Sequence, residues 1–289
     1  ARGHQVAATV RNDEQKDDYS GTPVSACAVS DLLDITAGFL KGYDAVIHAA
    51  GRAHKKENSL ADAEKNNRRD NLEAPIRLAE LCRINGVRRL IVIGSIGAAL
   101  LDNDIKTGKT TIEQTWKTSP YRASKLQADI ELRKMLPEEC AIVRLPMLYG
   151  KFARGNFSFL SRLVEKGIPL PVYGIRNQRA FVAISTLCSF VNVLLDHPQA
   201  AERIWEIRDA NEISTPDFVC ALADALHVTC PLLFPFPPPL IKIGGRLFGM
   251  NRAVDSLFGN LHIDLTPVKD RLGWQPAFDT EEGLMQELN

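Results

Sequence analysis

Tyr121 and Lys125, four residues apart, are the side chains with the clearest capacity for acid–base chemistry. Their surroundings predict a helix that begins at Pro120, because proline lacks the N–H that would be unpaired in a first turn. The spacing then puts the phenol and the ammonium on one helix face. Since a nearby cation favours the phenolate, we expect Lys125 to lower the pKa of Tyr121 from its ordinary value of ~10. Such a pair suits proton exchange with a sugar or alcohol hydroxyl; the alternative is a tyrosine packed beneath an exposed lysine.

The composition limits the class of protein. The chain has 289 residues, of which 45% are hydrophobic and 24% charged, and its formal net charge is zero. These values are ordinary for a soluble globular protein and give no reason to expect nucleic acid or an anionic membrane as a partner. No apolar run approaches the ~18 residues of a membrane span. The six cysteines are scattered without a C-x-x-C pair, so we expect reduced thiols, no disulfide and no metal site, in a cytoplasmic protein.

The first 150 residues alternate between apolar runs and amphipathic segments. Strands are expected over residues 5–10, 24–29, 44–51, 89–95 and 140–145, and helices over residues 31–40, 71–85 and from 120 onward. Strands that are apolar on both faces and alternate with helices predict an α/β fold with a parallel, helix-covered sheet. Ligands bind beyond the carboxyl ends of such strands. Five candidate positions follow strands in this way: Arg11, Asp31, Ala49 to Gly51, Ser95, and Pro146 to Gly150.

From about residue 151 the segments become shorter and richer in Pro and Gly. Helices are expected over residues 156–165, 184–195 and 215–226, one last helix from Thr266 to Gly273, and short strands over 169–173 and 204–207. The change of pattern predicts two domains, over residues 1–150 and 151–289, with segments of the second crossing back to the sheet.

Four further motifs accompany the tyrosine and the lysine. They are His48–Gly51 and Ile93–Ser95, each ending a predicted strand, Arg144–Gly150, and Leu272–Pro276. In this order and spacing they make the chain resemble, over nearly its whole length, the extended short-chain dehydrogenase/reductase family, in the branch of nucleotide-sugar epimerases and dehydratases. The resemblance implies a Rossmann-like, doubly wound parallel sheet that binds a dinucleotide, followed by a smaller α/β domain for the nucleotide sugar.

One feature of that family does not occur in this sequence. The family opens with a strand and a glycine-rich turn, G-x-x-G-x-x-G, that seats the cofactor pyrophosphate at a helix N-terminus. The present chain begins with Ala1-Arg2-Gly3-His4 and then a predicted strand. We therefore expect that upstream residues are absent from the sequence.

The resemblance implies a role for each matching residue. Tyr121 would be the general base or acid on the sugar O4 hydroxyl, Lys125 would lower its pKa and bind the nicotinamide ribose, and Ser95 would bind the reacting hydroxyl. A serine that only caps backbone is the alternative for Ser95. Cofactor contacts are implied, besides Tyr121 and Lys125, for Arg11, Asp31, Leu32, Ala49, Ala50, Gly51 and Asn71. Contacts with the nucleotide sugar are implied for Asn156, Tyr173, Arg179 and Arg252, each of which has a solvated surface position as its alternative.

The cofactor is expected to be NAD or NADP. NAD-selective folds of this kind carry an acidic residue at the end of the second strand, whereas an arginine accommodates a 2′-phosphate. Arg11 stands at that position and favours NADP; the alternative is an arginine lying over the adenine.

Three functions are compatible with these residues. The first is 4-epimerisation of a UDP-hexose by hydride transfer at C4, the second is NADPH-dependent reduction of a UDP-4-keto sugar, and the third is a non-catalytic nucleotide-binding scaffold. Dehydration at C4 and C6 is disfavoured, because Ile96 and Gly97 follow Ser95 where dehydratases carry an acidic pair. The resemblance also implies bacterial polysaccharide biosynthesis and a homodimer formed through the helices of Asn71 and Tyr121.

Overall fold

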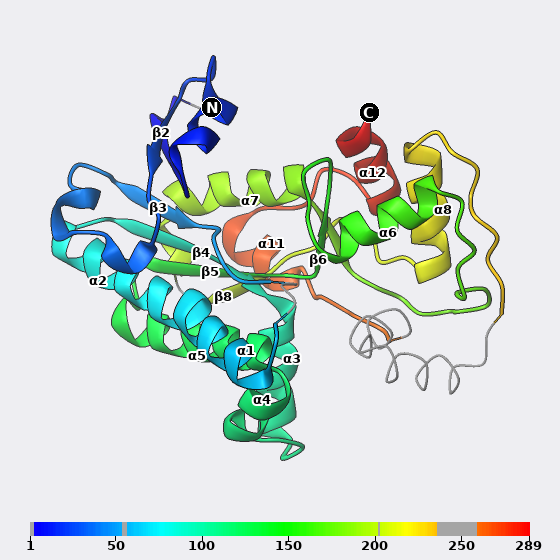
Figure 1. The fold of residues 1–289 in the computed structure, drawn as a ribbon, viewed down its shortest axis with the longest axis horizontal. Coiled ribbons are helices and arrows are strands. Elements are labelled where there is room, and N and C mark those ends of the chain that lie inside the picture. Colours follow the sequence, from blue (N-terminus) through cyan, green and yellow to red (C-terminus); the bar gives the residue numbers. More distant parts are fainter. Residues whose placement is uncertain (1–2, 54–56, 202, 236–258) are drawn as a thin grey trace.

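A four-stranded parallel sheet lies at the centre of the computed structural model, which describes residues 3–53, 57–201, 203–235 and 259–289. Its strand order is β3-β4-β5-β8. The strands are β3 (Ala45–His48), β4 (Arg89–Ser95), β5 (Cys140–Leu145) and β8 (Ile204–Glu206). The predicted α/β class with a Rossmann-like parallel sheet is confirmed (Figure 1).

Helices cover both faces of this sheet (Figure 1). On one face lie α2 (Ala74–Asn85) and α5 (Pro120–Met135), and on the other lie α7 (Ile184–Asp196) and α11 (Thr266–Leu272). All six residues of β5 are buried because side chains on each of its faces meet a helical layer. The resulting three layers leave the carboxyl ends of the strands as the accessible rim of the sheet.

Two shorter parallel pairs accompany the central sheet. β1 (Val6–Val10) pairs with β2 (Val24–Ala28) in a separate two-stranded sheet, from Val6 opposite Val24 to Val10 opposite Ala28. β6 (Met147–Tyr149) pairs with β7 (Phe181–Ala183). Neither β6 nor β7 was predicted.

The helices α6 (Asn156–Glu165), α8 (Thr215–Ala225) and α12 (Thr280–Leu288) lie together beside the central sheet (Figure 1). They share an apolar core with β6 and β7. Asp209, fully buried, ties these elements together: it accepts hydrogen bonds from Tyr149 Oη at 2.7 Å, Thr186 Oγ1 at 2.8 Å and Ala183 N at 3.1 Å. Burial raises the pKa of this carboxyl to about 6.

Several segments differ from expectation near the site. Residues 96–118, for which no helix or strand was predicted, hold α3 (Ile96–Lys106) and α4 (Ile112–Thr118), whose starts are capped by Ser95 and by a Thr111–Gln114 capping box. The expected helix over residues 71–85 is longer: α1 (Leu60–Arg68) continues through a π-helical turn, Arg69–Glu73, into α2, where Pro75 occupies the first turn. The caps, rather than apolar periodicity, determine these elements.

Other differences from the predicted elements lie farther from the site. Residues 13–19 and 32–40 form short 3-10 turns, namely Asp13–Tyr19, Leu32–Asp34 and Ala37–Leu40. The expected strand over 169–173 is reduced to one bridge between Leu170 and Leu233. The helix from Thr266 is followed by α12, so it is not the last.

The cysteine prediction was wrong at one pair. Cys220 and Cys230 form a disulfide with a Cα–Cα distance of 5.1 Å. Cys220 lies on α8, and the chain after that helix turns back beside it, a proximity that scattered cysteines in a sequence do not reveal. Among the described residues, no helix is both long and apolar enough to cross a bilayer.

Candidate active site

The first turn of α5 carries Tyr121 to the end of β4. Pro120 lies in that first turn, as predicted. The side chain of Tyr121 forms a hydrogen bond with the side chain of Ser95, the last residue of β4. Ser95 also accepts the N–H of Gly97 at 3.2 Å and so caps α3. The serine therefore contacts both partners considered for it, a reactive hydroxyl group and the helix backbone.

The pKa of Tyr121 contradicts the expectation. Burial raises this pKa above its ordinary value; the hydrogen bond with Ser95 lowers it, and the charge of Asp129 raises it. The spacing of the two residues in the sequence reveals a neighbouring cation but not burial, and burial disfavours the charged phenolate. In this structure Tyr121 is accordingly a neutral phenol, the form that donates a proton.

Lys125 lies one turn farther along α5 and is buried. Its Nζ donates to the backbone carbonyl of Ile93 in β4 at 3.4 Å. Burial lowers the pKa of Lys125, and the charge of Asp129 raises it. The alternative of a lysine exposed above a packed tyrosine is therefore excluded.

The chain leaves β3 through small residues that come close to this lysine. A methyl group at Gly51 would lie 3.0 Å from Asn71 Oδ1 and 3.3 Å from Lys125 Nζ. Ala49, Ala50 and Gly51 themselves are exposed. Backbone thus passes close to the lysine with no side chain between them, and a side chain at this position would press on Asn71 and Lys125.

Asn71 holds that strand-end segment in place. Its Oδ1 accepts the N–H of Arg52 at 2.8 Å, and its Nδ2 donates to Arg52 O at 3.0 Å and to Asn67 Oδ1 at 2.9 Å. The side chain is 1% exposed. The structure therefore shows Asn71 as an anchor for the residues after β3.

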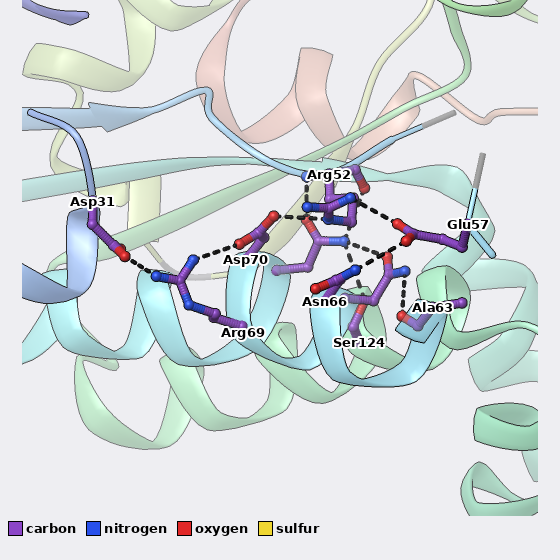
Figure 2. A network of polar contacts seen from close by, with 10 residues as sticks. Asp31, Arg52, Glu57, Ala63, Asn66, Arg69, Asp70 and Ser124 are labelled. Carbon is purple, nitrogen blue, oxygen red and sulfur yellow. Dashed lines mark hydrogen bonds and ion pairs between the residues drawn. The ribbon is translucent and has the colours of Figure 1, made fainter. Parts of the chain in front are cut away.

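A chain of alternating charges extends from this anchor, as Figure 2 shows. Arg52 donates from Nε to Asp70 Oδ2 at 2.8 Å and pairs from Nη1 with Glu57 Oε1 at 2.7 Å. Arg69 pairs with Asp70 at 3.2 Å and with Asp31. Sequence reasoning did not single out Arg52, Arg69 or Asp70; the available signal was the mixture of opposite charges over residues 52–70.

Three of the predicted cofactor contacts, Arg11, Asp31 and Leu32, follow the ends of β1 and β2. Asp31 accepts the N–H of Leu33 at 3.0 Å and pairs with Arg69, so its carboxylate already has two partners. Leu32 packs against the core formed with α2 and α5. Arg11 is exposed, and its backbone N–H donates to Gln15 Oε1 at 2.9 Å.

A buried ion pair lies one turn beyond Lys125 on α5. Arg144 donates from Nε to Asp129 Oδ2 at 2.8 Å, and the two side chains are only 8% and 3% exposed. Asp129 was not among the predicted site residues. Its signal was a carboxylate four residues after Lys125, on the helix face that holds both.

The predicted substrate residues are more dispersed. Arg179 is half-buried; its backbone bridges Ile213 and Leu261, and its guanidinium donates to Gly259 O. Asn156 is the exposed first residue of α6, and Tyr173 is 63% exposed. Arg252 lies outside the described residues.

One apolar contact joins the two sets of candidates. Ile96, the residue after Ser95, packs against the buried side chains of Ala180, Leu261 and Ile263. Ala180 directly follows Arg179. The Ser95 end of β4 and the backbone beside Arg179 are therefore neighbours.

Comparisons with known proteins identify the family of the chain. The model of the NAD dependent epimerase/dehydratase family matches residues 1–207. The UDP-glucose 4-epimerase of Vibrio cholerae is 33% identical over 285 residues, which cover 97% of this chain and 86% of that protein. The dTDP-glucose 4,6-dehydratase of Xanthomonas campestris pv. campestris is 27% identical over 197 residues, covering 64% of this chain and 52% of that protein.

Solved structures show the same fold. The UDP-glucuronic acid 4-epimerase of Bacillus cereus in complex with NAD matches with a TM-score of 0.71 at 14% identity, over 100% of this chain and 90% of that chain. MoeE5 in complex with UDP-glucose and NAD matches with a TM-score of 0.69 at 18% identity, over 99% of this chain and 90% of that chain.

Proposed function

Because the chain belongs to the NAD-dependent epimerase/dehydratase family, we propose that it is a nucleotide-sugar 4-epimerase that acts at C4 of a UDP-hexose. The observation that carries the proposal is the joining of Tyr121 and Ser95 at the end of β4, with Lys125 buried on the same helix. The extended similarity to the Vibrio cholerae UDP-glucose 4-epimerase supports the choice of reaction.

The residues at the strand ends fit a nicotinamide dinucleotide. Gly51 lets the chain after β3 lie close to Asn71 and Lys125, where an added methyl group would be only 3.0 and 3.3 Å from their polar atoms. Lys125 offers an ammonium for ribose hydroxyls, and Ala49, Ala50 and Gly51 let a ligand approach the backbone, with Arg11, Asp31 and Leu32 near the adenine. When bound, the dinucleotide supplies the acceptor and donor of the hydride.

The residues of the chain move the proton. Ser95 orients the O4 hydroxyl; the phenolate form of Tyr121 takes its proton when C4 is oxidised, and the resulting phenol returns it when C4 is reduced. The raised pKa of Tyr121 favours the returning step. For the first step, the ammonium of Lys125 is proposed to stabilise the phenolate. Rotation of the 4-keto sugar between the two steps would invert the configuration at C4.

Arg179 is proposed to bind the diphosphate, since a guanidinium suits phosphate oxygens. Asn156 and Arg252 are proposed as further diphosphate ligands and Tyr173 as a contact of the uracil. The proposed division places the dinucleotide on residues 1–150 and the sugar nucleotide on residues 151–289. A cytoplasmic homodimer that serves polysaccharide biosynthesis completes the proposal.

A second candidate is an NADPH-dependent 4-ketoreductase, which the exposed Arg11 at the end of β1 favours. The apolar packing of Ile96 and the absence of a side chain at Gly97 argue against dehydration, because neither residue can act as an acid or base.

The test is conversion of UDP-glucose to UDP-galactose by the purified chain, with and without added NAD or NADPH. The Tyr121→Phe variant is expected to lose about 10²- to 10⁴-fold in kcat, the usual contribution of a positioned acid–base group. Tyr43→Phe, at an exposed tyrosine, is the matched control and should retain full activity.

The outcomes separate the candidates. Interconversion without net use of cofactor supports the epimerase, and stoichiometric oxidation of NADPH on a UDP-4-keto sugar supports the reductase. Full activity of Tyr121→Phe would contradict the role of this phenol in either. A chain that binds UDP-sugars and dinucleotide without turnover would be a scaffold.

A further inference from the structure

Beneath the proposed site lies a row of buried charges. Lys125 and Asp129, on the buried face of α5, are 9% and 2% exposed, and Arg144, on β5, is 7% exposed. Burying charges without partners is costly, so each needs a counter-charge or a set of hydrogen bonds.

Arg144 is held from two sides. Its Nε donates to Asp129 Oδ2 at 2.8 Å, and its Nη1 lies 3.5 Å from Glu206 Oε1. Arg144 and Glu206 are opposite each other on the parallel strands β5 and β8. Because Glu206 also pairs with Arg144, Asp129 is not the only counter-charge of this guanidinium.

Lys125 meets weaker partners. Its Nζ donates to Ile93 O at 3.4 Å, a long hydrogen bond to a neutral group. His48, on β3, is buried, and burial together with the charge of Lys125 lowers its pKa to about 4, so this imidazole is neutral near pH 7. Asp129 lies one helical turn away on the same buried face of α5, without a direct ion pair to Lys125, and its charge raises the pKa of Lys125 against the effect of burial.

We propose that Asp129 is a positioning residue that acts through Lys125: its carboxylate is the counter-charge that keeps the buried ammonium protonated. The proposal deepens the function proposed above and rests on Tyr121 and Lys125 having the roles given there. Arg144 competes for the same carboxylate and therefore limits how strongly Asp129 holds the lysine.

The effects of Lys125 and Asp129 on each other's pKa agree, since each favours the charged form of the other. Burial raises the pKa of Asp129 to about 6, while Arg144 and then Lys125 lower it, and Asp102 on α3 raises it. Asp129 also raises the pKa of Tyr121. A change in activity of an Asp129 variant would therefore mix effects on the phenol and on the ammonium, so the lysine must be measured directly.

The experiment is a pH titration of the Lys125 ammonium, followed by NMR in the full chain labelled with ¹³C at the lysine Cε and assigned with Lys125→Met. In Asp129→Asn the pKa of Lys125 should fall by about 1–3 units, the usual effect of losing a close opposite charge. In Arg144→Gln, which removes the competing cation, it should rise. Asp129→Glu should retain most of the original value.

A double variant guards against loss of the fold, since removing one member of a buried ion pair is strongly destabilising whereas replacing both by apolar residues is often tolerated. Asp129→Leu with Arg144→Met should also lower the pKa of Lys125. A lysine that titrates at the same pH in the parent, in Arg144→Gln and in the folded Asp129 variants would overturn the proposal.

The same variants distinguish this inference from the function on which it rests. In the parent, loss of Lys125 charge should set the alkaline limb of kcat, and that limb should move down with the Lys125 pKa in Asp129→Asn. A purely structural ion pair would lower Tm and leave the limb in place, which contradicts the positioning role. If the parent shows no turnover of any UDP-sugar, the proposed function fails while the NMR titration still tests the effect of Asp129 on Lys125.

Discussion

Ser95 and Tyr121 are joined by a side-chain hydrogen bond that connects the end of β4 to the first turn of α5. The hydrogen bond places two hydroxyl groups at one point of the strand rim, where a substrate hydroxyl can meet both. Ser95 has a second duty, since it caps α3 through the N–H of Gly97.

Ser95→Ala should therefore reduce both activity and stability. We expect kcat to fall about 10- to 100-fold, because a hydrogen bond to a charged group contributes about 1.5–3 kcal/mol. Loss of the cap should cost about 1 kcal/mol of unfolding free energy. Ser95→Thr keeps the hydroxyl and is the control. Assays of initial rate and urea unfolding of the three proteins check this, and an alanine variant with the parent kcat would exclude the serine from the reaction.

Gly51→Ala should weaken dinucleotide binding. The added methyl group would press on Asn71 Oδ1 and Lys125 Nζ, at 3.0 and 3.3 Å. Overpacking costs about 1–3 kcal/mol, so we expect Kd for NAD to rise about tenfold by calorimetric titration. Gly38→Ala is the matched control, because a methyl group there meets nothing within 4 Å. Equal affinity of the Gly51 and Gly38 variants would show that the cofactor does not lie at this strand end.

His48 should make the protein sensitive to acid. Burial, and then the charge of Lys125, lowers the pKa of His48 from 6.5 to about 4. The unfolded chain then binds the proton more tightly than the folded chain, so this contribution to stability is complete above pH 6.5 and is lost as the pH falls through about 4. A difference of that size corresponds to about 3 kcal/mol.

The measurement is the change in unfolding free energy between pH 7 and pH 4, compared between the parent and His48→Gln. The variant should lose about 3 kcal/mol less than the parent. Asp129 and Asp209, whose pKa values are raised to about 6, act in the opposite sense in both proteins and cancel in the comparison. His4→Gln, at an exposed position, should behave as the parent; the same behaviour from His48→Gln would contradict the prediction.

The Cys220–Cys230 disulfide predicts how many thiols of the chain can react before and after reduction. Of the six cysteines in the sequence, four are free thiols in the structure. A thiol reagent added to the unfolded, unreduced protein should therefore react with four groups per chain, and with six after reduction. Closing a loop of this size stabilises the fold by about 3 kcal/mol, so Cys220→Ser should unfold at lower urea and Cys188→Ser should not. Six reactive thiols before reduction would favour the original expectation from sequence.

Sequence reasoning succeeded where a segment carries its own boundary signals. β4, β5 and α6 have the predicted ends, because continuous apolar runs mark the strands and amphipathic spacing marks the helix. Gly86 and Gly273 end α2 and α11 with φ of 65° and 62°, a conformation that glycine adopts at low cost. Pro120 likewise marked the start of α5.

Prediction from the sequence failed for properties that depend on the tertiary structure. The raised pKa of Tyr121 depends on burial, which a spacing of four residues cannot disclose. Asp129 meets Arg144 across the interface of α5 and β5, and Asn71 meets Arg52 nineteen residues away. The motif residues could be found from the sequence, whereas the partners that they meet in the fold could not.

The apolar contact of Ile96 with Ala180, Leu261 and Ile263 connects two parts of the proposed site, so that a movement of one part can be transmitted to the other. On one side of this contact is the hydroxyl of Ser95, and on the other is the backbone that carries Arg179. A displacement of that backbone, as when a guanidinium shifts to meet an anion, would push on Ile96 and tilt the serine. Binding of the diphosphate of a sugar nucleotide at Arg179 would then change the position of Ser95 relative to the reacting carbon.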